Sequence, residues 1–120
     1  MISNAVPNLH ILGHPLIQHK LAVMRMKQTN KPTFRRLLKE ISFLMGYEVT
    51  RHLETYETTI DTPLESTRVH MTHEDRLVVV PILRAGLGMA ESLMELFPLA
   101  LEGHIGLYRD PATKKPVEYF

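Results

Sequence analysis

The apolar positions in the second half of the chain form two kinds of pattern, which predict two kinds of element. Residues 77–83 are apolar without a break, as in a strand that is buried on both faces of a parallel sheet. After a glycine turn at 84–88, apolar residues recur at helical spacing from Met89 to Phe97. A second apolar segment, 104–108, predicts another strand. The order strand, helix, strand over residues 77–110 predicts that the two strands lie parallel in one sheet.

Two helices are predicted earlier, within residues 14–46. The first begins at Pro15, because proline is favoured at the first helical position. The second carries an apolar stripe at helical spacing and is expected to end at Gly46. Its apolar positions are Phe34, Leu37, Leu38, Ile41, Leu44 and Met45. Residues 1–13 are expected to form an extended arm.

Extended structure is predicted for three further segments. Residues 47–60 are rich in Thr, Val and Tyr, and residues 66–71 are able to pair back on them as a short strand. Residues 110–116 contain two prolines and two lysines and indicate a hairpin tip, after which 117–120 resume an extended pattern. No repeat, low-complexity tract or linker marks a boundary, so residues 1–120 are expected to form one α/β domain.

Composition and charge narrow the functional classes. A net charge of +1 leaves no large field for nucleic acid, and no segment has the pattern of a membrane span or a signal peptide. The absence of cysteine excludes disulfides, thiolate metal sites and a cysteine nucleophile. Seven histidines are present, but His70 and His73 lack enough neighbouring ligands to predict a metal site. A cytoplasmic protein without a protein-bound metal is expected.

Candidate chemistry gathers at the ends of the two parallel strands. Arg84 follows the first strand and Arg109 follows the second, so both arginines are expected at the edge of the sheet where open α/β folds bind ligands. Two guanidinium groups suit a polyanion, and the backbone of Ala85, Gly86 and Gly88 is expected to approach it closely. The same residues are also compatible with a plain turn that carries a solvated arginine.

Three segments, HPLIQHKLAVMR, VVVPILRAGLGM and GHIGLYRDPATKKPVEY, resemble the uracil phosphoribosyltransferase family in order and spacing, from about His14 to Tyr119. The resemblance implies a type I phosphoribosyltransferase fold. It also implies transfer of phosphoribose from phosphoribosyl pyrophosphate to N1 of uracil, which gives UMP and pyrophosphate. Arg84 and Arg109 match family arginines that contact phosphoribosyl pyrophosphate. Magnesium bound through the pyrophosphate, a possible GTP effector and a homo-oligomer are implied as well.

The resemblance departs from the family pattern at the end of the chain. In the family, the ribose phosphate is held by a later acidic loop with Thr-Gly-Gly, and uracil by a segment near the C-terminus. Both would lie beyond Phe120, so we expect an N-terminal portion of the fold with the pyrophosphate side of the site, inactive alone and with unknown catalytic residues. The strand residues Val78, Val80, Ile82 and Ile105 should then lack cover, which predicts poor stability or self-association.

Alternatives to an enzyme remain open on the sequence. One is a non-catalytic anion-binding or oligomerisation partner derived from the family. Another, an RNA-binding regulator, is disfavoured because no basic patch with interleaved aromatic residues is present. Lys114 and Lys115 fit a lid over the pyrophosphate, although solubilising charges are the favoured interpretation. The Arg84–Ala85 peptide is a candidate for the strained or cis form that such loops adopt.

Overall fold

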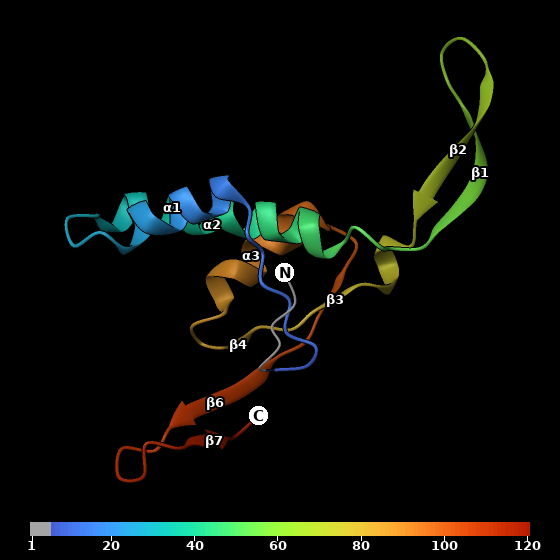
Figure 1. Cartoon of the computed structure of the whole chain (residues 1–120). Coiled ribbons are helices and arrows are strands. Elements are labelled where there is room, and N and C mark those ends of the chain that lie inside the picture. Colours follow the sequence, from blue (N-terminus) through green and yellow to red (C-terminus); the bar gives the residue numbers. More distant parts are fainter. Residues whose placement is uncertain (1–5) are drawn as a thin grey trace.

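The computed structural model describes residues 6–120 and has a mixed α/β architecture (Figure 1). This confirms the predicted fold class. The elements in chain order are α1 (Pro15–Arg25), α2 (Lys31–Val49), β1 (Thr55–Asp61), β2 (Ser66–Thr72), the 3₁₀ turn η1 (Glu74–Arg76), β3 (Val78–Val79), β4 (Ile82–Leu83), α3 (Leu87–Leu96), β5 (Leu101–Glu102), β6 (Ile105–Arg109) and β7 (Pro116–Glu118). The first five residues of the predicted arm lie outside the described residues.

The three helices pack against one another and provide the small buried core. The first two begin at side-chain caps, since His14 Nδ1 accepts from Leu16 N at 3.2 Å and Asn30 Oδ1 accepts from Thr33 N at 2.9 Å. Packing of α1 on α2 and of α2 on α3 then buries part of the apolar stripes, while Leu16, Leu21 and Phe34 stay exposed. The buried hydrophobic residues are Ile17, Leu37, Ile41, Ala90 and Ala100. Within residues 6–120, no helix is both long enough and apolar enough to cross a membrane.

The end of α2 differs from the prediction. The helix continues through Gly46 to Val49, so residues 47–49 are helical rather than extended. Gly46 is buried at the contact with α3, where a Cβ atom would lie 2.8 Å from Leu93 Cδ2 and 2.9 Å from Leu96 Cδ2. Gly46 therefore allows α2 and α3 to approach closely and does not end α2. A glycine that ends a helix and a glycine that allows close helix packing look alike in the sequence.

The predicted parallel pairing of 77–83 with 104–108 is confirmed by β4, which pairs with β6 in the register Leu83 to Gly106. β3 also pairs in parallel with β5, which lies before the predicted second strand. Between these pairs, Gly103 N–H donates to Val79 O at 3.0 Å and Ile105 N–H donates to Pro81 O at 3.1 Å. The predicted single strand is nevertheless divided in two, because Pro81 has no N–H to donate to its neighbour.

Two antiparallel hairpins extend from opposite sides of the helical centre (Figure 1). β1 pairs with β2 along their full length, as predicted, although the extended structure begins at Thr55 rather than Tyr47. β6 pairs with β7, and the predicted hairpin tip connects these two strands. The radius of gyration is 18.4 Å, against roughly 14 Å for a compact chain of this length. Much of the chain therefore lies outside the common core.

The apolar strand residues are exposed, as the sequence predicts. Val78, Val80, Ile82 and Ile105 have relative exposures of 56%, 46%, 51% and 40%. β3 and β4 are also edge strands of their sheets. This surface therefore presents apolar side chains and strand backbone together, a combination that favours association with another polypeptide.

Candidate anion-binding site

The two predicted arginines meet at one end of the parallel strands. Arg84 is the first residue after β4, and Arg109 is the last residue of the neighbouring strand β6. Both line a cavity of about 500 Å³. Its other lining residues are Ile82, Leu83, Ala85, Leu107, Tyr108, Lys114 and Pro116. The structure thus brings Arg84, Ala85 and Arg109 together as the strand order predicts, and it adds Lys114.

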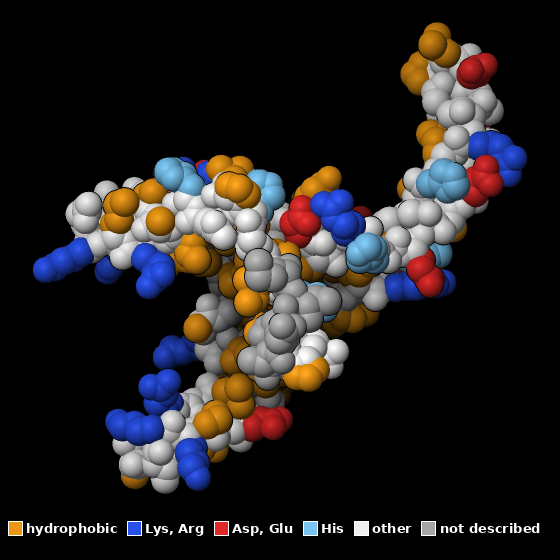
Figure 2. Space-filling model, in the orientation of Figure 1, with side chains coloured by type: hydrophobic (Ala, Val, Ile, Leu, Met, Phe, Trp, Pro, Cys, Tyr) orange, Lys and Arg blue, Asp and Glu red, His pale blue; other side chains and the backbone are white. Residues whose placement is uncertain are grey.

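The cavity is positively charged. Arg84, Arg109 and Lys114 are exposed, and none of them forms an ion pair within residues 6–120. No acidic side chain is among the lining residues. Figure 2 shows Lys and Arg side chains gathered around the end of the β6–β7 hairpin. Guanidinium and ammonium groups without a protein partner are suited to an anion with several oxygens.

The glycine turn has a different structure from the one expected. Gly86 N–H donates to Ile82 O at 2.8 Å, and Leu87 N–H donates to Arg84 O at 3.1 Å, so these two amides are engaged inside the turn. A Cβ atom on Gly86 would lie 2.9 Å from Ile82 N, and one on Gly88 would lie 2.9 Å from Leu38 Cδ2. Close backbone contact therefore accounts for Gly86, whereas the atom close to Gly88 is the end of a side chain, which is able to move. Contact of Gly86 or Gly88 with an anion stays a prediction.

The cis peptide bond lies one position earlier than the sequence suggested. It joins Leu83 to Arg84, whereas the Arg84–Ala85 peptide was the candidate. No proline occurs in this turn, and non-proline residues carry no local signal for the isomer, so the sequence did not indicate which peptide it would be.

The loop between β6 and β7 is closed by its own hydrogen bonds. Asp110 Oδ1 accepts from Ala112 N at 2.7 Å and from Thr113 N at 3.2 Å. The backbone of Asp110 also exchanges bonds across the loop, accepting from Lys114 N at 2.8 Å and donating to Lys115 O at 2.9 Å. This closure places Lys114 in the cavity, although the sequence favoured a solubilising charge. A pattern of polar residues gives the length of such a loop but not the direction of its side chains.

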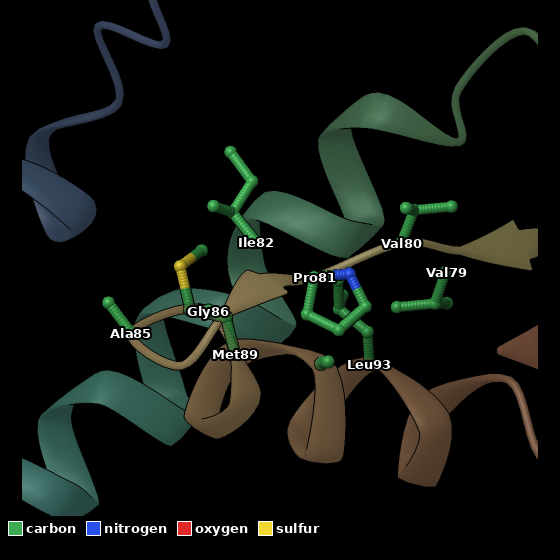
Figure 3. Close-up of a pocket in the computed structure, with 9 residues that line it drawn as sticks. Val79, Val80, Pro81, Ile82, Ala85, Gly86, Met89 and Leu93 are labelled. Carbon is green, nitrogen blue, oxygen red and sulfur yellow. The ribbon is translucent and has the colours of Figure 1, made fainter. Parts of the chain in front are cut away.

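A second cavity, of about 540 Å³, lies between residues 79–82 and α3 (Figure 3). Its lining is apolar and contains no titratable side chain. The lining residues are Val79, Val80, Pro81, Ile82, Ala85, Gly86, Met89, Ala90 and Leu93. It is slightly larger than the arginine cavity, but it has no group that would neutralise an anion. The chemistry therefore points to the smaller cavity.

The histidines do not form a metal site in the part of the chain that the structure describes. Within residues 6–120, no three His, Asp or Glu side chains are grouped closely enough to hold a metal ion. The His73 ring instead stacks on Tyr56, with ring centroids 4.4 Å apart. His73 thus has a packing role at the base of the β1–β2 hairpin.

Residues 11–120 match the family model described as uracil phosphoribosyltransferase. A uracil phosphoribosyltransferase from Thermosipho melanesiensis is 54% identical over 112 residues, which cover 93% of this chain and 54% of that relative. One from Rhodospirillum centenum is 59% identical over 113 residues, covering 94% of this chain and 52% of the relative.

A solved structure, the AQ2163 protein from Aquifex aeolicus, shares the fold with a TM-score of 0.83 and 34% identity, over 91% of this chain and 52% of that one. This chain spans about half the length of the curated relatives it matches. The residues that match the family model include the whole strand, helix and strand unit that carries Arg84 and Arg109. The chain belongs to the uracil phosphoribosyltransferase family.

Proposed function

We propose that this chain binds the pyrophosphate end of phosphoribosyl pyrophosphate in a uracil phosphoribosyltransferase. The complete reaction joins N1 of uracil to C1 of the ribose and gives UMP and pyrophosphate, a step of pyrimidine salvage. The observation that carries the proposal is the meeting of Arg84 and Arg109 in one cavity at the ends of two parallel strands. Membership of the family supports the identity of the anion. A non-catalytic role has no comparable support.

The chemistry assigns a clear task to these side chains. In the transfer, the bond from C1 to the pyrophosphate oxygen breaks, the bond from N1 to C1 forms, and the proton on N1 is lost. Negative charge therefore grows on the leaving oxygens while the ribose becomes cationic. Arg84 and Arg109 would stabilise that charge through fixed N–H donors, which act without reorganising at the moment of reaction. Ala85 would line the cavity beside them as an apolar residue.

Magnesium is compatible with this cavity only as part of the substrate. Its lining has cations and apolar groups but no carboxylate, so the protein residues there offer no ligand set for the ion. The ion would instead be held by oxygens of the pyrophosphate, where it supplies charge neutralisation. The residues present thus fit a magnesium complex of the substrate, and Arg84 and Arg109 would bind the oxygens that the ion leaves free.

Three other family properties are proposed in less detail: a homo-oligomer, a GTP effector and a cytoplasmic location. A homo-oligomer is supported by the exposed apolar strands, which favour contact with another polypeptide. A GTP effector and a cytoplasmic location are proposed from the family resemblance alone. None of the described residues is assigned to either.

The test is UMP formation from uracil, phosphoribosyl pyrophosphate and magnesium. Two proteins are compared: this chain, and this chain joined to the part of the Thermosipho melanesiensis relative that follows the matched residues. We expect turnover in the joined protein and none in the chain alone. Turnover by the chain alone would show that residues 1–120 hold a complete site. A joined protein that folds but neither turns over nor binds pyrophosphate would contradict the proposed function.

A further inference from the structure

The anion cavity contains a third cation that the strand ends do not explain. Lys114 lines the cavity together with Arg84 and Arg109, although it comes from the loop after β6 rather than from a strand end. Like the two arginines, it has no ion-pair partner within residues 6–120. Lys114 is exposed, and it borders the cavity with two other cations in spite of the repulsion between like charges.

The loop backbone determines which of its two lysines lies there. Lys114 has a φ angle of 59°, and its N–H donates to Asp110 O at 2.8 Å. Lys115 N–H donates to Thr113 Oγ1 at 3.3 Å, and Lys115 O accepts from Asp110 N at 2.9 Å. Lys115 does not line the cavity. The two lysines are adjacent in sequence and equal in charge, so they form a natural pair of test and control.

Asp110, the acid in the same loop, forms no ion pair with Lys114. Its Oδ1 accepts from the backbone amides of Ala112 and Thr113, and Asp110 is not among the residues that line the cavity. No carboxylate among the lining residues therefore competes with a ligand for the three cations. Three separated cations match an anion whose charge is spread over two linked phosphates better than a single phosphate, because each cation then has oxygens within reach.

We propose that Lys114 is a third binding residue for a diphosphate and that it makes the cavity select diphosphate over monophosphate. This inference rests on the proposed function, because it takes the same cavity as the anion site. Arg84 and Arg109 act as planar forks on the strand ends, while Lys114 acts as a point charge that reaches the anion from the loop. The selectivity comes from the added charge and not from the shape of the loop.

The experiment is isothermal titration calorimetry of the full 120-residue chain with inorganic pyrophosphate and, separately, with orthophosphate at low ionic strength. The variants are Lys114→Gln, Lys114→Arg and the control Lys115→Gln. We expect Lys114→Gln to weaken pyrophosphate binding about five- to tenfold, as the loss of one close charge predicts. Orthophosphate binding should change less. Lys114→Arg should restore most of the affinity, and Lys115→Gln should change it less than about twofold.

The outcomes distinguish a wrong role for Lys114 from a wrong anion site. If the unmodified chain does not bind pyrophosphate, the anion site itself is wrong, and the role of Lys114 is wrong with it. If the chain binds but Lys114→Gln behaves like Lys115→Gln, only the role of Lys114 is wrong. Equal losses in Lys114→Gln and Lys114→Arg would show that the loop conformation matters and the charge does not, which also overturns the inference.

Discussion

Gly86 N–H donates to Ile82 O at 2.8 Å, and this contact is so close that a Cβ atom on Gly86 would lie 2.9 Å from Ile82 N and 3.0 Å from Ile82 O. The obstructing atoms belong to the backbone, so they are unable to move aside as the end of a side chain does. The turn that leads from β4 into α3 therefore requires a residue without a Cβ atom at position 86, even though the φ angle of Gly86 is an ordinary −76°.

We predict that Gly86→Ala destabilises the chain by about 1–3 kcal/mol, because the turn must shift to accept the added methyl group. The shift should also weaken pyrophosphate binding, since Arg84 lies in the same turn. Gly13→Ala is the control, because no atom lies within 4 Å of a Cβ built there. Urea unfolding followed by circular dichroism measures the difference. Equal midpoints for the two variants would show that the turn has more freedom than its geometry indicates.

Arg84→Lys keeps the positive charge but loses the planar fork of N–H donors. In the protein joined to the second half of a relative, we predict that kcat/KM falls about 10- to 100-fold, which corresponds to the loss of one charge-assisted hydrogen bond. Arg68→Lys is the control, because Arg68 pairs with Glu57 on the distant β1–β2 hairpin. Steady-state kinetics at saturating uracil gives the comparison. Unchanged activity in Arg84→Lys would remove the assigned role of this arginine.

The contact between α1 and α2 should depend on pH through Glu40. A hydrogen bond from Lys20 Nζ at 2.7 Å, and then one from Arg36 at 2.9 Å, hold the pKa of Glu40 below its ordinary value. Because the folded-state pKa is depressed, the stabilisation is present above the unfolded-state pKa and is lost as the pH falls through the folded-state pKa. We therefore predict that part of the acid sensitivity of the chain comes from this group.

Lys20→Gln removes the larger cause of the depressed pKa. The variant should be less stable than the unmodified chain at about pH 7 and should lose less stability on acidification to about pH 3. Lys27→Gln is the control, because Lys27 forms no ion pair in the described part of the chain. Urea midpoints at both pH values provide the test, and parallel losses in all three proteins would exclude Glu40 as the source.

The exposed edge at β3 and β4 predicts self-association. Sedimentation velocity should show a mass that rises with concentration, and Val78→Lys should lower that tendency, because Val78 is exposed on β3 and a charge on an edge strand opposes pairing. Val49→Lys is a matched control, since Val49 is 67% exposed at the far end of α2. A monodisperse monomer that melts in one sharp cooperative transition would contradict the prediction.

Local sequence patterns predicted the elements well where one interaction dominates. The apolar run at 77–83 and the helical spacing after Met89 identified the parallel pair and its crossover helix, because an unbroken apolar run and a helical period are both local signals. They were wrong where a long-range contact decides the outcome. Gly46 was expected to end a helix but packs against Leu93. The division of the strand at Pro81 has a local cause instead, the missing N–H of proline, which the apolar neighbours of Pro81 concealed.

The candidate site likewise contains residues whose position the sequence predicts and one whose position it does not. Parallel strand order places Arg84 and Arg109 at one edge, so their meeting followed from topology. The position of Lys114 did not, because it depends on how Asp110 closes the loop through hydrogen bonds to Ala112, Thr113 and Lys114. A residue whose direction is determined by a turn has no periodic signal in the sequence.

All three cations of the cavity come from residues 84–114, and the elements that hold them are neighbours in the chain. Contacts of such short sequence separation cost little entropy to close and form early in folding. During synthesis, the positively charged side of this site would be able to assemble as soon as the β6–β7 hairpin leaves the ribosome.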